Sequence, residues 1–185
     1  MRPDWNEYFM IIAKIVSTRS TCNSRPIGCV VVRDKQILST GYNGAVPGAP
    51  HCIDRKDNQG NPFCFRRVQG VPEHKKQEYC VGSHAEKNAV AQAAREGISV
   101  KGSAIYVTVS PCFDCMKMLA VAQVRHVYFE IPYESEDKAR DQFWQQQGKE
   151  MFKTFEQLVV SEKASKFTFE MIQFPTSKRR LKEIS

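Results

Sequence analysis

The sequence predicts an α/β protein in which helices flank one mixed β-sheet. Two observations carry this prediction. Short runs rich in β-branched and aromatic residues alternate along the chain with segments whose apolar residues recur at helical spacing. No internal repeat or second unit is evident, so we expect residues 1–185 to form one domain, long enough to bury a sizeable core without disulfides.

The N-terminal part contains a predicted helix, a strand pair and a long irregular segment. Apolar residues at helical spacing predict a helix over Trp5–Arg19. Ile27–Val32 and Gln36–Gly41 are predicted strands, and Asp34-Lys35 between them suits a hairpin turn. Residues 42–79 are rich in Gly, Pro, Asn and charge. Loops of this length inside compact domains are usually functional, or are fixed to the domain by a cross-link such as a metal site.

The C-terminal part alternates helices and strands. The expected helices are Ala85–Arg95, Cys112–Gln123 and Ser135–Gln147, and the expected strands are Ser103–Val109 and Arg125–Ile131. Gly97 would close the first of these helices, and Pro111 would occupy the first position of the second. The last strand is either Met151–Val160 or Phe167–Phe174, and residues from about 175 to 185 would form a basic tail.

Composition and charge narrow the class of protein. Hydrophobic residues make up 42% and charged residues 25% of the chain, which is ordinary for a globular protein. No apolar run reaches the roughly 18 residues of a membrane span, and the N-terminus MRPDWNEYFM lacks the apolar core of a secretory signal. We therefore expect a cytoplasmic protein, in the host cytoplasm if the source is viral, without a membrane partner.

The net charge of +7 suits an anionic partner, such as a nucleic acid, a nucleotide or an acidic surface. Charge alone does not distinguish a polynucleotide from a phosphorylated metabolite, and a merely solvated basic surface is the commoner case. The seven cysteines are an odd number without a secretory signal. In a reducing compartment, clustered Cys and His residues indicate metal ligands instead of a disulfide framework.

A metal-ligand pattern stands out in two places. His84 and Glu86 lie one residue apart in CVGSHAEKNAV, residues 80–90, where a helical pattern begins. Cys112 and Cys115 follow in PCFDC at the start of the next predicted helix, where the helix dipole favours the thiolate that binds metal. One nitrogen and two sulfur ligands with a fourth position left open are typical of a catalytic zinc.

Glu86 favours a catalytic over a structural zinc. Residues i and i+2 of a regular helix point to different sides, so His84 and Glu86 can approach one metal only from the start of the helix. There a carboxylate can accept a proton and later return it, as general base and then general acid. The signature H-x-E followed by P-C-x-x-C is that of zinc nucleobase deaminases. The alternative is a buried histidine, a surface glutamate and a redox CxxC.

Six pieces of sequence carry a resemblance to a known family. They are Arg19–Cys22 (RSTC), Ile27–Val31 (IGCVV), Thr40–Gly44 (TGYNG), His51–Asp54 (HCID), His84–Ala89 (HAEKNA) and Tyr106–Cys112 (YVTVSPC). With them, the chain resembles the deoxycytidylate (dCMP) deaminases of the cytidine deaminase superfamily as far as about Tyr133. GYNG before a long loop is more specific than the shared zinc motif. The resemblance implies a three-layer α/β/α sandwich with a five-stranded mixed sheet.

The resemblance also implies an activity. It is the hydrolytic deamination of dCMP to dUMP with release of ammonia, supplying dUMP for thymidylate synthesis, with Glu86 carrying the proton to N3 and then to the departing amino group. The residues implied to bind the substrate are Asn43, Ala85, Ser24, Arg25, Ser110 and Tyr133. Among them, Ser24, Arg25 and Tyr133 would meet the 5′-phosphate, which a guanidinium fits by bidentate geometry. For Arg25 and Tyr133, surface packing is an equal alternative.

Regulation and assembly are implied by the same resemblance. Related enzymes are often hexamers, activated by dCTP and inhibited by dTTP, usually with Mg²⁺. The implied effector residues are Tyr42, Asn43, Gly44 and Arg95. An ordinary helix C-terminal cation is the alternative for Arg95.

The remaining cysteines suggest a second metal. The resemblance implies a structural zinc at Cys22 and Cys52, for which we expect His74 and Cys80 as the other ligands, with Cys64 as a rival. Such a site would staple the segment 42–79 to the domain. Reduced, unpaired cysteines are the alternative. Cys29, in an apolar strand, is expected to be a core thiol.

Three other functions remain open. The first is the same chemistry on a polynucleotide, a tRNA or single-stranded DNA, which would need stacking platforms beside a basic groove. Most aromatic residues fall instead at core-periodic positions, so no nucleic-acid partner is expected. The second is a zinc-stabilised binding module without turnover, which would have no use for Glu86. The third is deamination of free cytidine or of a riboflavin-pathway pyrimidine.

Overall fold

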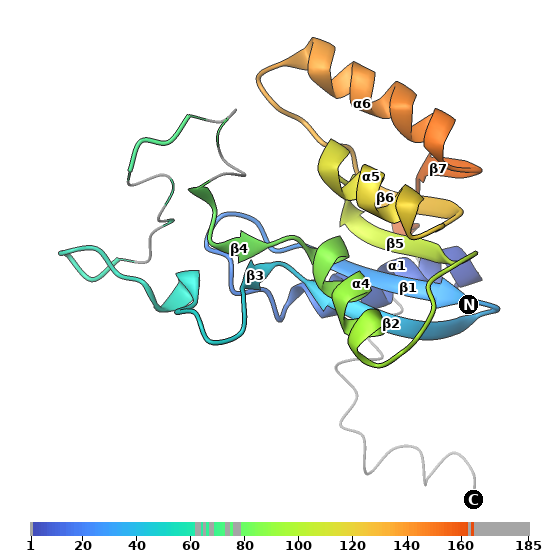
Figure 1. Cartoon of the computed structure of the whole chain (residues 1–185), viewed down its shortest axis with the longest axis horizontal. Coiled ribbons are helices and arrows are strands. Elements are labelled where there is room, and N and C mark those ends of the chain that lie inside the picture. Colours follow the sequence, from blue (N-terminus) through green and yellow to red (C-terminus); the bar gives the residue numbers. More distant parts are fainter. Residues whose placement is uncertain are drawn as a thin grey trace, which may run out of the picture.

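The computed structural model describes residues 2–61, 64, 66, 69–72, 75, 79–162 and 164 (Figure 1). The expected basic tail and the candidate strand Phe167–Phe174 lie outside these residues. Within them, no helix is both long enough and apolar enough to cross a membrane.

Helices and strands alternate as the sequence predicts. The helices are α1 (Trp5–Ser17), the 3₁₀ turn η1 (Cys52–Asp54), α4 (Ala85–Arg95), α5 (Phe113–Val121) and α6 (Lys138–Met151). The strands are β1 (Gly28–Arg33), β2 (Gln36–Tyr42), β3 (Gly44–Ala45), β4 (Gly82–Ser83), β5 (Ala104–Val109), β6 (His126–Ile131) and β7 (Thr154–Gln157).

Five strands form one mixed sheet in the order β2-β1-β5-β6-β7. β1 pairs antiparallel with both β2 and β5, whereas β5, β6 and β7 run parallel. This confirms the predicted mixed sheet. The short strands β3 and β4 form a separate antiparallel pair at the two ends of the long segment 42–79.

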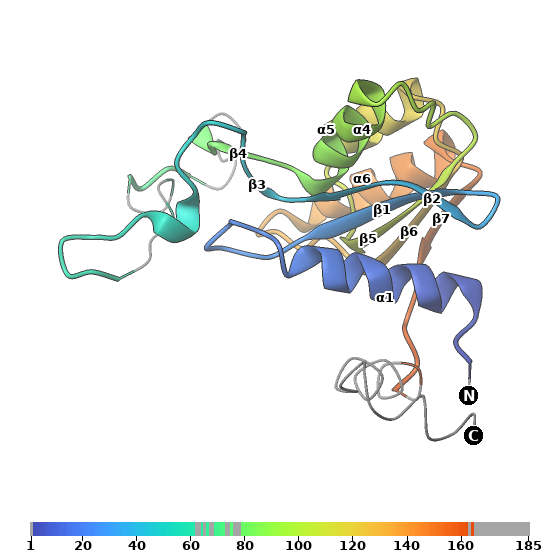
Figure 2. The ribbon, with the colours of Figure 1, turned by 90° about the horizontal axis from the view of Figure 1, so that it is seen from below.

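Helices cover both faces of the sheet, as expected for three layers. Figure 2 shows α1 on one face and α4, α5 and α6 on the other. The alternation of β1 explains this arrangement, because successive side chains of a strand point to opposite faces. Val30 and Val32 pack with residues of α1, while Cys29 and Val31 pack with those of α4 and α5. Cys29 is fully buried, which confirms the predicted core thiol.

Several element ends differ from the prediction for local reasons. Cys112, with an extended backbone, caps α5, so Pro111 precedes the cap and does not occupy the first helical position. α6 begins at Lys138 because the Asp137 side chain accepts a hydrogen bond from the Arg140 backbone N–H and so caps the helix there. The predicted hairpin turn is confirmed, with Asp34 and Lys35 both at positive φ, as type I′ turns require.

Helix α4 lies unusually close to the sheet. Gly41 of β2 lies against the α4 backbone. A Cβ at this position would overlap with backbone atoms of Ala85 and Ala89. The Asn88 amide also donates a hydrogen bond to the Tyr42 carbonyl oxygen at 2.7 Å. Together these contacts fix the start of α4 relative to the end of β2.

The close approach predicts a cost for enlarging Gly41. Gly41→Ala should lower the free energy of unfolding by about 1–3 kcal/mol, because the methyl group meets helix backbone that has little freedom to move. Urea denaturation measures this loss. Gly82→Ala is the matched control, since a Cβ there makes only ordinary contacts and its φ is not positive. Equal stability of the two variants would contradict the tight packing of α4 on β2.

Candidate active site

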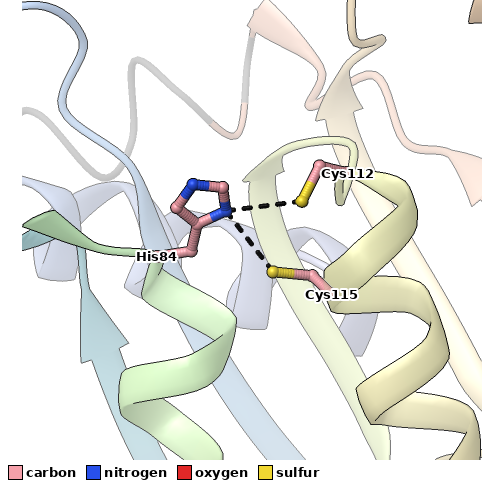
Figure 3. Close-up of side chains that lie close together, drawn as sticks. All are labelled: His84, Cys112 and Cys115. Carbon is pink, nitrogen blue, oxygen red and sulfur yellow. Dashed lines mark hydrogen bonds between the residues drawn. The ribbon is translucent and has the colours of Figure 1, made fainter. Parts of the chain in front are cut away.

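Three ligand-type side chains meet where two helices begin. His84 is the N-cap of α4 and Cys112 the N-cap of α5, and Cys115 lies in the first turn of α5. The His84 Nδ1 lies 3.4 Å from both sulfurs (Figure 3). Among the described residues, these three are the group of His, Cys, Asp or Glu side chains whose ligand atoms all lie within 4.8 Å of one another.

The donor set and its spacing fit a zinc ion. Tetrahedral zinc with sulfur at about 2.3 Å and nitrogen at about 2.0–2.1 Å places the two kinds of ligand atom about 3.6 Å apart. The observed separation of 3.4 Å is close to this value for both Nδ1–Sγ pairs. With three protein ligands, one position of the tetrahedron remains for a fourth group.

The two thiols differ in their proton affinity. The pKa of Cys112 is lowered to about 4, mainly because its sulfur accepts a hydrogen bond from Cys115 and also one from His84. The pKa of Cys115 is raised, because it donates that hydrogen bond and is buried. The pair therefore shares one proton, which a bound cation would displace.

Glu86 is buried beside this group. Its carboxyl lies in the first turn of α4 with only 4% of the residue exposed. Burial raises its pKa from 4.5 to about 7, while the neighbouring His84 opposes the rise. A carboxyl that titrates near neutral pH can both accept and donate a proton under physiological conditions.

One cavity of about 320 Å³ joins the ligand group to residues from distant parts of the chain. His84, Glu86 and Cys112 line it. Five of the six predicted substrate-binding residues line it too: Ser24, Arg25, Asn43, Ser110 and Tyr133. The sixth, Ala85, is fully buried beneath β2 and is not among the lining residues.

Asn43 is engaged mainly by its own loop. Its side-chain oxygen accepts hydrogen bonds from the Ser20 hydroxyl and the Ile27 backbone N–H, at 2.6 and 2.8 Å. Its amide donates to the Arg25 carbonyl oxygen at 2.8 Å. Asn43 therefore orders residues 20–27, and within the described part of the chain one of its two amide hydrogens has no acceptor.

Sequence reasoning missed two charged residues of the cavity, Arg66 and Glu134. Arg66 lies in the long segment 42–79, which has no periodicity from which its position could be inferred. Glu134 directly follows Tyr133, so its proximity was the one available signal. Arg66 and Glu134 thus line the same cavity as Arg25.

Four cysteines also line this cavity: Cys22, Cys52, Cys64 and Cys80. The pKa of Cys52 is raised, first by burial and then by the proximity of the other three thiols. Their sulfurs do not form a group within 4.8 Å in the part of the chain that the structure describes. His74, expected beside them, lies outside the described residues.

Two of the four expected effector residues line the cavity. Asn43 and Gly44 line the cavity, whereas Tyr42 and Arg95 are not among its lining residues. The Tyr42 carbonyl oxygen accepts a hydrogen bond from the Asn88 side chain near the start of α4. Arg95 lies in the last turn of α4, where its guanidinium forms an ion pair with Glu96 at 2.8 Å.

Comparisons with known proteins define the class. The family model of the cytidine and deoxycytidylate deaminase zinc-binding region matches residues 3–131. The chain belongs to this family of zinc-dependent deaminases, and His84, Cys112 and Cys115 form the zinc site typical of it.

Several of the proteins that this chain resembles are dCMP deaminases. The deoxycytidylate deaminase of Mycobacterium phage D29 is 38% identical over 133 residues, covering 69% of this chain and 95% of that protein. ComE operon protein 2 of Bacillus subtilis is 33% identical over 144 residues, covering 78% of this chain and 68% of that protein. The structure of a cyanophage S-TIM5 dCMP deaminase with dCMP and dUMP matches at a TM-score of 0.62 and 29% identity, covering 85% and 99% of the two chains.

The raised pKa of Glu86 predicts a pH dependence of stability in the zinc-free protein. A carboxyl that binds its proton more tightly when folded stabilises the fold at low pH, and this contribution falls as pH rises from about 4.5 to about 7. Glu86→Gln should remove that fall, so the variant should gain up to about 3 kcal/mol relative to the native chain between about pH 5 and about pH 8. Urea denaturation after chelation measures this gain.

The control for this experiment is Glu150→Gln, the same change at an exposed position of α6. Its stability should follow the native pH profile. A Glu86→Gln variant that also follows the native profile would show that burial does not raise the pKa of Glu86.

Proposed function

We propose that the chain catalyses the hydrolytic deamination of dCMP to dUMP with release of ammonia, and so supplies dUMP for thymidylate synthesis in the cytoplasm. One observation carries the proposal: the buried Glu86 and two members of the His-Cys-Cys group, His84 and Cys112, line the same cavity as Arg25. The similarity to dCMP deaminases, one of them bound to dCMP and dUMP, supports this choice of substrate.

The chemistry divides between the metal and Glu86. Zinc held by His84, Cys112 and Cys115 would supply an activated water at its fourth position. The Glu86 carboxylate would accept a proton at its oxygen, deliver it to N3 of cytosine and then assist the departure of the amino group. Burial suits this task, because it favours the protonated form of the carboxyl, so that Glu86 can hold the proton between the two transfers, and it excludes competing water.

The substrate's phosphate would bind at the side of Arg25. A guanidinium forms two parallel hydrogen bonds with a phosphate, and Ser24 and Tyr133 would add donors next to it. The remaining amide hydrogen of Asn43 and the hydroxyl of Ser110 would contact the nucleoside, and the backbone of Ala85 the base. The position of Ser24, Arg25 and Tyr133 around one cavity supports this assignment.

We extend the proposal to regulation and assembly as in related enzymes: a hexamer, activated by dCTP and inhibited by dTTP with Mg²⁺. Tyr42, Asn43, Gly44 and Arg95 would respond to the effector. Such control requires that an effector binds two states of the protein with different affinity. Gly44 and Asn43 border the substrate cavity, which would let an effector contact there alter substrate binding directly.

A second, structural zinc would be bound by Cys22, Cys52, Cys80 and His74, with Cys64 as the rival ligand. The shared cavity lining and the raised pKa of Cys52 support the proximity of the four thiols. A closed site of this kind would order the segment 42–79.

The substrate assignment predicts ammonia release from dCMP, and none from cytidine, dCTP or a cytosine-containing oligonucleotide. Glu86→Gln should lower kcat by at least about 10²-fold while zinc content stays unchanged, since the variant keeps the shape but loses the proton carrier. Glu150→Gln, remote on α6, is the matched control and should retain full activity.

The same assay run with dCTP or dTTP measures the proposed regulation. Turnover of the oligonucleotide alone would overturn the substrate, and equal activity of the Glu86→Gln variant would overturn the proton carrier.

The structural zinc predicts two zinc ions per native chain by metal analysis. Cys22→Ser should lower the content to one and leave the catalytic ligands intact. Cys29→Ala, which removes a buried core thiol elsewhere, should keep both. One zinc per native chain, unchanged in the Cys22→Ser variant, would contradict the second site.

A further inference from the structure

An ion pair joins the two helices that carry the metal ligands. Lys87, in the first turn of α4, places its Nζ 2.6 Å from an Oδ2 of Asp114, in the first turn of α5. Lys87 is three residues after His84, and Asp114 stands between Cys112 and Cys115. The pair therefore spans the same two helix N-termini that converge in Figure 3.

Lys87 is poorly placed by itself, because a cation in the first turn of a helix opposes the helix dipole of α4. Asp114, a carboxylate in the first turn of α5, suits the dipole of its own helix and supplies the negative charge that offsets the cost of Lys87. A local violation that is compensated elsewhere is expected at functional sites.

The geometry also separates this contact from its neighbour. Lys117 approaches the other carboxylate oxygen of Asp114 at 3.9 Å, but it belongs to α5 itself. Of these two contacts of Asp114, the one with Lys87 is the contact that connects α4 to α5. The side chains of Lys87 and Asp114 are 42% and 49% exposed, so the pair contributes little to global stability.

We propose that the Lys87–Asp114 ion pair is a positioning clamp that holds His84 against the two cysteines and slows the loss of zinc. Release of the metal requires its ligands to separate, and separation of the helix N-termini breaks the clamp. The inference rests on the zinc site of the family and does not depend on which pyrimidine is the substrate.

The experiment measures the rate at which a zinc-loaded protein yields its metal to a chromophoric chelator in excess. Lys87→Met and Asp114→Asn should each lose the catalytic zinc about twofold to fivefold faster than the native chain, the range expected from the loss of one half-exposed ion pair. The double variant should be no faster than the faster single variant, because one contact is removed in all three. The charge-exchanged variant, Lys87→Asp with Asp114→Lys, should recover most of the native rate.

Two controls separate a clamp from general destabilisation. Lys117→Met removes the other cation near Asp114 and should leave the rate of zinc loss unchanged. The zinc-free forms of the native chain and of Lys87→Met should unfold at the same urea concentration. A native rate of zinc loss in Lys87→Met, additive effects in the double variant, or a lower urea midpoint of the zinc-free variant would each overturn the proposal. Absence of dCMP turnover would affect the proposed function alone.

Discussion

The convergence of two helix N-termini at one edge of the sheet is the constraint on which the site depends. β5 ends at Val109 and α5 begins four residues later. α4 follows the long segment 42–79 in the chain, and its start lies at the same edge of the sheet. His84 and Cys112, as N-caps, have extended backbones, and this frees their side chains to turn toward each other. A helix N-terminus leaves backbone N–H groups without helical partners and favours negative charge. Thiolates are therefore stabilised where the two helices meet.

The core supplies the rigidity that this convergence needs. α4 packs on the sheet through three fully buried alanines, Ala85, Ala89 and Ala93, and Gly41 lacks a Cβ that would keep the helix away. α5 is anchored by the buried side chains Met116 and Leu119. Ligand atoms can hold a spacing of 3.4 Å only if both helices have fixed positions. The metal site therefore depends on the close packing of α4 against the sheet.

Periodicity was sufficient to predict helices flanking one mixed sheet, and two short motifs were sufficient to predict the metal triad. The three layers and the five strands were implied by the resemblance to a known family. The ends of α6 were not predictable from periodicity, since the Asp137 cap and the bonds from Ser135 to the buried Asp141 carboxylate decide where the helix begins. Arg66 and Glu134 were missed for another reason. Their meeting in one cavity depends on how an aperiodic segment lies against the domain, and no local signal encodes that contact.

The buried carboxyl and the ligand group depend on each other through charge. Burial raises the pKa of Glu86 to about 7 in the metal-free chain, and the Cys115 thiol keeps its proton and donates it in a hydrogen bond to the Cys112 sulfur. A divalent cation bound by the triad would favour the ionised form of every one of these groups and so release protons as it binds. Conversely, an ionised Glu86 would strengthen the attraction for the cation. Each of these ionisable groups would destabilise an ordinary core. Here they are compatible with a stable fold because they act together on one cation. This mutual dependence explains why the fold concentrates its buried acid, two thiols and an imidazole at one place.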